Sequence, residues 1–278
     1  MKLKFTKMHG AGNDFVLIDD RDGHVPWEDH FLMAALASRR TGIGCEGVIL
    51  VQHSDKADFR MRFLNPDGTE VEMCGNGARC AAAFANRIGA SGTALTMETM
   101  CGLVDAQLND KGACVWMPEP VKKNYGLELK VGEETVRGDF LVMGVPHFVV
   151  QVPNVSTVDV QGLGRALRLH PAFAPDGTNV DFVTFRAPNR MTMRTYERGV
   201  EAESGACGTG AVACAVVAVE TAGFTLPTQV KMSSGCDLII DGDWRHNKCT
   251  GLTLSGPVNF VYTGEVELDE LDMSGEID

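Results

Sequence analysis

Two cysteines occupy the same position in a five-residue motif that occurs twice. The first copy is Cys74-Gly75-Asn76-Gly77-Ala78 and the second is Cys207-Gly208-Thr209-Gly210-Ala211. Each copy opens an alanine-rich apolar run, which predicts a helix that is buried on nearly all sides. A cysteine at a helix start lies at the positive end of the macrodipole, which favours thiolate and lowers the pKa. We therefore expect two reactive thiols, each beside N–H groups that can bind a carboxylate.

Two such thiols could form a disulfide, hold a metal or exchange protons with a carbon. A metal site is not expected, because no Cys-x-x-Cys pair is present and no further His or Cys has ligand spacing. Inverting a carbon centre requires a base on one face and an acid on the other. A thiolate and a thiol related by two-fold symmetry would meet this requirement. Cys80 and Cys214 lie deeper in the two predicted helices and are assigned to packing.

The two halves of the chain resemble each other beyond the cysteine motif. The shift that superposes Cys74 on Cys207 also aligns Phe15-Val16-Leu17 with Phe148-Val149-Val150. The pattern predicts an α+β fold with two pseudo-symmetric domains. Each domain would be a mostly antiparallel β-sheet or barrel wrapped around a buried central helix. The predicted domains are residues 1–118, completed by a C-terminal strand at 265–278, and residues 119–264.

Each half is expected to contain the same succession of elements. A β-rich opening is followed by a helix, two strands, the cysteine-led helix and three antiparallel strands. The predicted helices outside the motif cover 27–39 and 160–170, and Gly89 and Gly223 are expected to end the two cysteine-led helices. The β-rich segments expected are 2–19, 48–53, 58–64, 95–98, 102–108, 113–117, 138–152, 180–185, 191–196, 228–233, 236–241 and 249–255.

Composition limits the partners of the protein. The chain has 278 residues and a net charge of −12, which argues against nucleic acid or an anionic membrane as a partner. The N-terminus lacks an apolar signal segment, and the longest apolar run, residues 211–219, is too short to span a bilayer. The nine cysteines show no disulfide framework. We therefore expect a cytoplasmic protein that acts on a small molecule.

Several separate motifs together resemble the diaminopimelate epimerase family. Besides the two cysteine motifs, these are Lys7-Met8-His9-Gly10-Ala11-Gly12-Asn13-Asp14-Phe15, Asn65-Pro66-Asp67-Gly68 and Tyr196-Glu197-Arg198-Gly199. The resemblance implies a cofactor-independent, two-base epimerase with its active site between two pseudo-symmetric domains. It also implies interconversion of LL- and meso-2,6-diaminopimelate for lysine and peptidoglycan precursors, and a homodimer.

The resemblance also assigns roles to individual residues. Cys74 and Cys207 would transfer protons, with His147 and Glu197 completing the catalytic set. The substrate-binding residues that it implies are Asn13, Asn65, Gly75, Asn76, Asn179, Glu197, Arg198, Gly208 and Thr209. From the residues alone, Asn13 and Asn65 could satisfy only local turns, Arg198 could form a surface ion pair, and His147 could be a half-buried structural side chain.

The sequence departs from the family pattern at three places, and these keep alternatives open. Val145 stands where many members have Asn before Pro-His, Glu46-Gly47 replaces Asp followed by Gly or Gln, and Ser204-Gly205 is unusual. Loss of an amide at 145 leaves racemisation of another polar amino acid as an alternative. A second alternative is a redox-responsive binding protein in which Cys74 and Cys207 form a reversible disulfide.

Overall fold

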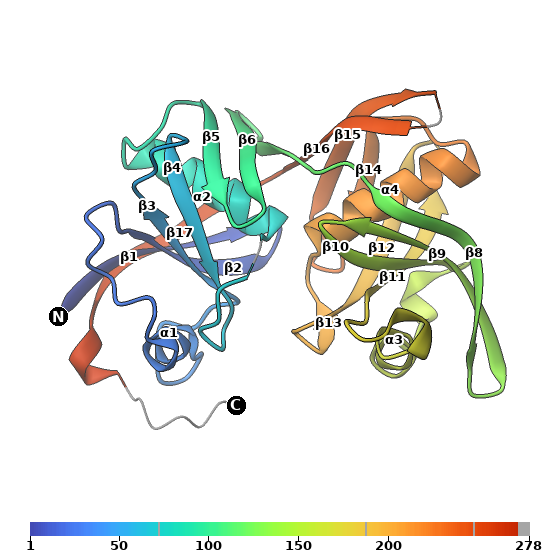
Figure 1. Ribbon diagram of the computed structural model, residues 1–278, viewed down its shortest axis with the longest axis horizontal. Coiled ribbons are helices and arrows are strands. Elements are labelled where there is room, and N and C mark those ends of the chain that lie inside the picture. The colour runs from blue at the N-terminus through green and yellow to red at the C-terminus, as the bar shows by residue number, and fades with distance from the viewer. Residues whose placement is uncertain (72, 187, 247, 272–278) are drawn as a thin grey trace. The chain divides into compact units, whose positions relative to one another are not determined.

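The computed structural model describes residues 1–271 except 72, 187 and 247, and its contacts divide the chain into two units (Figure 1). Unit 1 comprises Met1–Val115 and Gly256–Asp278, and unit 2 comprises Trp116–Ser255. The part of the predicted terminal strand beyond residue 271 lies outside the described residues.

Within the described residues, the sheet of unit 1 contains eight strands, and the last of them along the chain lies at one edge. In spatial order they are β17 (Val258–Glu267), β1 (Lys2–Gly10), β2 (Asn13–Asp19), β3 (Val48–Gln52), β4 (Phe59–Leu64), β5 (Ala94–Thr99), β6 (Gly102–Asn109) and β7 (Gly112–Trp116). The pairs β2–β3 and β4–β5 are parallel, and the other pairs in this order are antiparallel.

The sheet of unit 2 repeats this arrangement strand by strand. In spatial order it contains β8 (Val121–Val131), β9 (Glu134–Met143), β10 (Val145–Gln151), β11 (Asn179–Arg186), β12 (Arg190–Glu197), β14 (Thr228–Lys231), β15 (Asp237–Arg245) and β16 (Lys248–Gly256). The parallel pairs are again the third and the fifth, β10–β11 and β12–β14. A short strand, β13 (Ala202–Ser204), pairs with β12. The predicted two-fold repeat of an α+β fold is confirmed.

One strand differs between the units in its place along the chain. In unit 2 the edge strand, β8, comes first, whereas in unit 1 the equivalent strand, β17, comes last. The sequence prediction placed the last strand at 265–278, but it begins at Val258, so residues 256–264 belong to unit 1. Strand β8 was not predicted, because its exposed polar side chains obscure the alternation that marks a strand.

In each unit a buried helix packs against several strands of the sheet. Helix α2 (Gly75–Arg87) packs against β1, β2, β3, β4, β6 and β17, and helix α4 (Gly208–Ala222) packs against β9, β10, β11, β14 and β15. Small side chains let these strands approach the helices on several sides, and residues 211–218 are all buried. Gly223 ends α4 in the left-handed conformation, and Gly89 also has a positive φ just after α2, as predicted.

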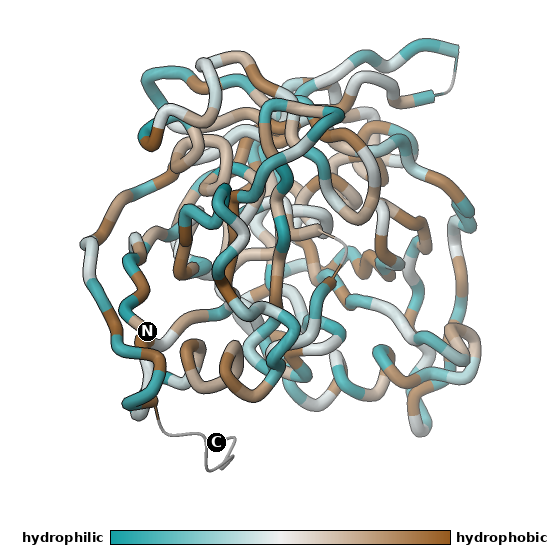
Figure 2. Tube along the Cα trace, turned by 60° about the vertical axis from the view of Figure 1, so that its left-hand side comes forward, coloured by the Kyte–Doolittle hydropathy of each residue, from teal (hydrophilic) through white to brown (hydrophobic). Residues whose placement is uncertain are grey.

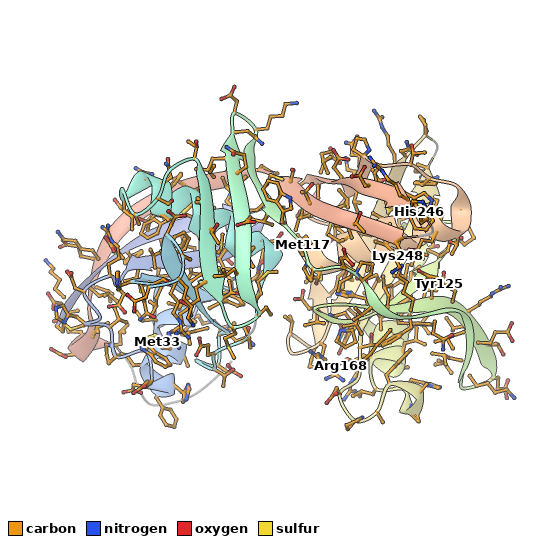
Figure 3. All side chains as sticks on the ribbon, turned by 45° about the horizontal axis from the view of Figure 1, so that its top comes forward. Met33, Met117, Tyr125, Arg168, His246 and Lys248 are labelled. Carbon is orange, nitrogen blue, oxygen red and sulfur yellow. The ribbon has the colours of Figure 1, made fainter. Side chains whose placement is uncertain are left out.

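A second helix closes the other side of each sheet. Helix α1 (His30–Ala37; Figure 1) begins at its Asp29 cap. Its Met33, labelled in Figure 3, is buried in a cluster with Val16. Helix α3 (Val160–Arg168) buries Leu167 with Phe182 in unit 2. Both helices are shorter than predicted, as is usual at frayed or capped ends. Figure 2 shows that hydrophobic and hydrophilic residues are interspersed along the whole chain.

The helices also bear on membrane association. Within the described part of the chain, no helix combines the length and apolar composition needed to cross a bilayer.

Alkaline pH is expected to weaken the fold because of two buried thiols in unit 1. Burial raises the pKa of Cys45 to about 11 and that of Cys80 to about 12. The unfolded chain releases these protons above about pH 9, whereas the folded chain retains them, so stability present below pH 9 is lost as the pH rises. Each thiol contributes a slope of up to about 1.4 kcal/mol per pH unit.

Urea unfolding at pH 8 and pH 10 measures this loss. The Cys80→Ala variant serves as the control, because removing one titrating thiol should flatten the dependence. Equal slopes for the two proteins would show that Cys80 does not titrate on unfolding.

Candidate active site

The two motif cysteines are the N-cap residues of the buried helices. Cys74 and Cys207 both have extended backbone conformations, with φ of −121° and −110°. Their carbonyls accept the first helical hydrogen bonds, from Ala78 N–H at 2.7 Å and Ala211 N–H at 3.0 Å. The backbone amides of Gly75, Asn76, Gly208 and Thr209, which were predicted to bind a carboxylate, therefore belong to the first turns of the two helices. In the first turn of a helix, an N–H group has no earlier helical carbonyl to which it can donate. Sequence alone was sufficient to place both thiols at helix starts.

Amide side chains surround the half-buried thiol of Cys74. Its Sγ donates to Asn13 Oδ1 at 3.6 Å, and Asn76 Nδ2 donates to the same oxygen at 3.2 Å. Asn76 is held by the fully buried Arg79, whose guanidinium donates to Asn76 Oδ1 at 2.9 Å. Asn13 Nδ2 in turn donates to Glu46. Asn13 and Asn76, both predicted site residues, are thus brought to Cys74, while their contact with a substrate stays a prediction.

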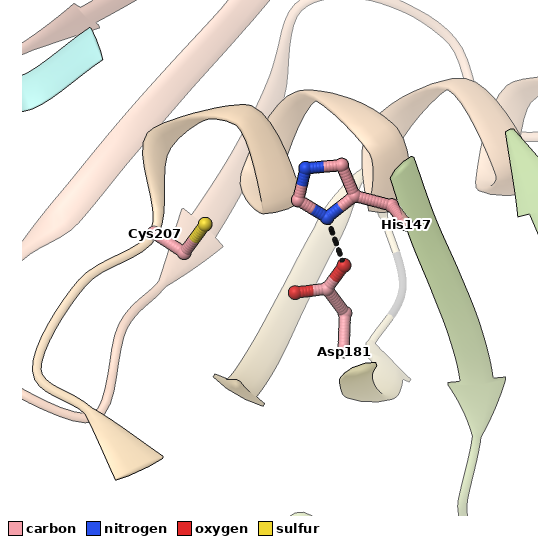
Figure 4. A group of neighbouring side chains, drawn as sticks. All are labelled: His147, Asp181 and Cys207. Carbon is pink, nitrogen blue, oxygen red and sulfur yellow. Dashed lines mark hydrogen bonds and ion pairs between the residues drawn. The ribbon is translucent and has the colours of Figure 1, made fainter. Parts of the chain in front are cut away.

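The surroundings of Cys207 are buried and contain an imidazole (Figure 4). Cys207 is 4% exposed and His147 is fully buried. Cys207 Sγ lies 3.6 Å from Thr209 Oγ1, which lies 3.0 Å from His147 Nε2. His147 Nδ1 is 2.7 Å from Asp181 Oδ2. His147 is therefore linked to Cys207 through a hydroxyl rather than directly, and it is fully buried rather than half-buried as the structural alternative had it.

Asp181 and Thr195 were missed by the sequence analysis. Both are buried, and they face each other across the β11–β12 pair, where Thr195 Oγ1 donates to Asp181 Oδ1 at 2.7 Å. The available signal was a carboxylate within the otherwise apolar run Val180-Asp181-Phe182-Val183. A charge placed in a buried strand requires hydrogen-bond partners, so such a residue indicates a special role.

The remaining predicted residues lie near the end of β12. Asn179, which is 4% exposed, accepts a hydrogen bond from the backbone N–H of Arg198 at 2.8 Å. Glu197 and Arg198 are half-buried at that end. In unit 1, Asn65 occupies the predicted turn, in which its carbonyl accepts from Gly68 N–H at 2.9 Å. The structure brings Asn179 and Arg198 together, and their binding roles stay predictions.

The pKa of Cys207 differs from the sequence expectation. Burial, followed by the negative charges of Glu197 and Asp181, raises this pKa well above its usual value, while the Thr209 hydroxyl and the Gly210 amide act in the opposite direction. The prediction that the helix start would lower the pKa is therefore wrong for Cys207. Desolvation of the thiolate outweighs the macrodipole, whose effect is only a fraction of a pKa unit to about one unit.

Comparison with known proteins agrees with the doubled cysteine motif. A family model described as diaminopimelate epimerase matches residues 5–123 and 140–261. The chain belongs to the diaminopimelate epimerase family. The diaminopimelate epimerase of Aquifex aeolicus (strain VF5) is 40% identical, with 97% of this chain and 100% of that protein covered. The one of Desulforapulum autotrophicum is 38% identical, with 96% and 100% covered.

The diaminopimelate epimerase family shares its fold with more distant enzymes. A probable proline racemase from Agrobacterium radiobacter K84 superposes with a TM-score of 0.77 at 16% identity, covering 97% of this chain and 94% of that one. At this identity the likeness concerns the fold alone. It supports the predicted two-domain α+β architecture.

Three side chains that could bind a metal ion lie close together at Cys207, although the sequence predicted no metal site. Among the described residues, ligand atoms of His147, Asp181 and Cys207 lie within 4.8 Å of one another. Hydrogen bonds already engage both imidazole nitrogens, one with Asp181 and the other with Thr209. A metal ion would have to displace these bonds and also deprotonate Cys207.

Alkylation of Cys207 by iodoacetamide is expected to be slow at pH 7. The thiolate is the reactive species, so the rate should rise about tenfold per pH unit while the thiol stays mainly protonated. Peptide mapping by mass spectrometry measures the rate, with the exposed Cys101 as an internal reference. Rapid labelling of Cys207 that does not change between pH 6 and pH 8 would contradict the raised pKa.

Proposed function

We propose that this protein is a cofactor-independent isomerase that interconverts LL- and meso-2,6-diaminopimelate by proton transfer between Cys74 and Cys207. The observation that carries the proposal is the presence, in each of two matching units, of a cysteine at the N-cap of a buried helix. Membership of the diaminopimelate epimerase family supplies the substrate.

The reaction needs one thiolate and one thiol. The thiolate takes the α-hydrogen as a proton, so the C–H bond breaks, an S–H bond forms and the electron pair stays on carbon. The other thiol then gives its proton to the opposite face and becomes the thiolate. Negative charge builds on the substrate carboxylate during the reaction. The backbone N–H groups of Gly75, Asn76, Gly208 and Thr209 donate hydrogen bonds to this carboxylate. Oriented amides in a dry site stabilise such charge better than water does.

The remaining site residues bind the rest of the zwitterion. A long diamino diacid needs donors for its distal carboxylate and acceptors for its distal ammonium. Arg198, Asn65 and Asn179 supply donors, and Glu197 supplies an acceptor. Asn13 orients the reacting end, and its contact with the thiol of Cys74 supports this role. His147 exchanges a proton with Cys207, and Glu197 influences the same thiol electrostatically.

The biological setting follows from the same reaction. Its product serves lysine and peptidoglycan precursor synthesis, and we place the enzyme in the cytoplasm as a homodimer. Net charge and the family resemblance support this setting and argue against nucleic acid as a partner. Sedimentation velocity measures the oligomeric state directly.

Exchange of the α-hydrogen of LL-diaminopimelate in deuterated water tests the proposal. The reduced enzyme should incorporate deuterium while forming the meso isomer, without added pyridoxal phosphate or metal. A panel of polar amino acids in the same assay tests whether Val145, which lacks the amide common in the family, has changed the substrate. Failure of the reduced protein to exchange any substrate would favour a redox-responsive binding protein instead.

A further inference from the structure

We propose that Asp181 and the side-chain hydroxyl of Thr209 complete a proton relay that links Cys207 to His147. This proposal rests on the function proposed above, since it assumes that Cys207 must both give up and accept a proton. Asp181 acts as a positioning residue, because it contacts His147 rather than the thiol. Thr209 acts as the link between sulfur and imidazole, in addition to its backbone role at the helix start.

The hydrogen bonds fix the direction of the relay. An ionised carboxylate only accepts, so His147 Nδ1 must carry the hydrogen that lies between it and Asp181 Oδ2, at 2.7 Å. In the neutral imidazole, Nε2 is then the acceptor. The Thr209 hydroxyl, 3.0 Å away, must donate to Nε2 and is left to accept from the Cys207 thiol at 3.6 Å. In this series of three hydrogen bonds, every donor therefore points from Cys207 toward Asp181.

A balanced proton transfer follows from this direction. The Cys207 S–H bond breaks as its proton passes to Thr209 Oγ1, while the hydroxyl proton of Thr209 passes to His147 Nε2. The products are a thiolate and an imidazolium, and the ionised Asp181 stabilises the imidazolium. Reversal of the same steps returns the proton to sulfur. Cys207 can therefore serve as base in one direction of the reaction and as acid in the other.

The fold itself does not require these polar groups. Strand register places Asp181 opposite Thr195 and beside Val149 in unit 2, and it places Val48 opposite Leu64 and beside Val16 in unit 1. The repeat therefore accommodates an apolar pair where unit 2 has a buried carboxylate and a hydroxyl. Burying a carboxylate is costly even when it is hydrogen-bonded. A functional role explains why that cost is tolerated.

The same register shows that unit 1 lacks this relay at the corresponding positions. His147 lies two residues before Val149, and the corresponding residue before Val16 is Asp14. Asp14 forms ion pairs with Lys7 at 2.6 Å and Arg39 at 2.8 Å. Imidazole relays a proton because it can accept at one ring nitrogen while the other stays hydrogen-bonded to a carboxylate. Asp14 has no such pair of ring nitrogens, and its carboxylate is held by two cations. The two thiols of the enzyme are thus served by different groups.

Asp181→Asn gives the first test. The new amide can accept from Thr195 and donate to His147 Nδ1, which reverses the imidazole tautomer and leaves Nε2 protonated. We expect kcat to fall at least about 10²-fold with KM little changed, since an Asp→Asn change in a serine-protease triad lowers kcat by about 10⁴ in this way. Nitrogen-15 NMR of labelled histidine should show the reversed tautomer. Asp139→Asn is the matched control, since Asp139 lies in unit 2 and accepts only from Gly126 N–H in the described contacts.

Substitutions at Thr209 give a second test that does not depend on the folding of the first variant. Thr209→Ser keeps the hydroxyl and Thr209→Val removes it, so kcat of the Val variant should lie at least about 10²-fold below that of the Ser variant. The rate of Cys207 alkylation should fall about tenfold in Thr209→Val relative to Thr209→Ser, because the thiol loses its proton acceptor. Equal kcat and equal alkylation for the Ser and Val variants would overturn the relay.

The outcomes also separate this proposal from the proposed function. If the wild-type protein exchanges no amino acid, the epimerase function fails, while the NMR tautomer and the alkylation rates still decide whether the relay exists. A protein that epimerises diaminopimelate but keeps the wild-type tautomer and kcat in Asp181→Asn would retain its function and refute the relay.

Discussion

Replacing Cys207 with alanine is expected to lower the rate of epimerisation at least about 10³-fold, and Cys74→Ala is expected to do the same. General acid–base groups contribute about 10² to 10⁴ each, and each thiol is proposed to be the only proton carrier on its face of the substrate. The remaining thiol can still remove a proton and return it to the same face. Each variant should therefore exchange the α-hydrogen of one stereoisomer into deuterated water without inverting it.

Chiral chromatography combined with mass spectrometry separates inversion from exchange in these variants. Cys80→Ala and Cys214→Ala are the matched controls, because they remove buried cysteines from the same two helices without touching the N-caps. They should retain turnover and lose only packing energy. Substantial inversion by either Cys74→Ala or Cys207→Ala would contradict the two-base mechanism.

Gly210→Ala is expected to impair the enzyme strongly, although alanine normally favours a helix over glycine by about 1 kcal/mol. A Cβ atom at 210 would lie only 2.4 Å from Asp181 Oδ1 and 3.2 Å from Met193 Cε. The carboxylate must move, and with it the hydrogen bond to His147. Overpacking of this kind costs about 1–3 kcal/mol, which exceeds the gain in helix propensity. A displacement of about 1 Å can also cost about 10²-fold in kcat.

Gly77→Ala, at the equivalent position of unit 1, is the control. A Cβ atom there would meet the flexible ends of Ile49 at 3.1 Å and Met61 at 3.4 Å, which can shift. We expect Gly77→Ala to keep or gain stability and to lose much less activity than Gly210→Ala. Thermal melting and steady-state kinetics of both variants provide the comparison. A Gly210→Ala protein as stable and active as Gly77→Ala would show that the close approach to Asp181 is unimportant.

The sequence by itself determined the elements that depend on local patterns. The doubled motif placed Cys74 and Cys207 at the starts of buried helices, because glycine and alanine after a cysteine form an apolar helix with a free first turn. Turn residues at 65–68 and the glycines after both helices were located for the same reason. The repeat predicted two matching α+β units, since similar patterns of apolar residues specify similar strands.

Tertiary structure decided the features that arise from long-range pairing. The last strand joins unit 1 because Val258–Glu267 pairs with Lys2–Gly10, a contact between the two ends of the chain. The pKa of Cys207 depends on how deeply folding buries the thiol and on nearby carboxylates, so the helix start alone gave the wrong direction. Asp181 reaches His147 only through the parallel pairing of their strands. Local sequence patterns determine which residues start a helix. Burial and strand register determine which charged side chains lie near those residues.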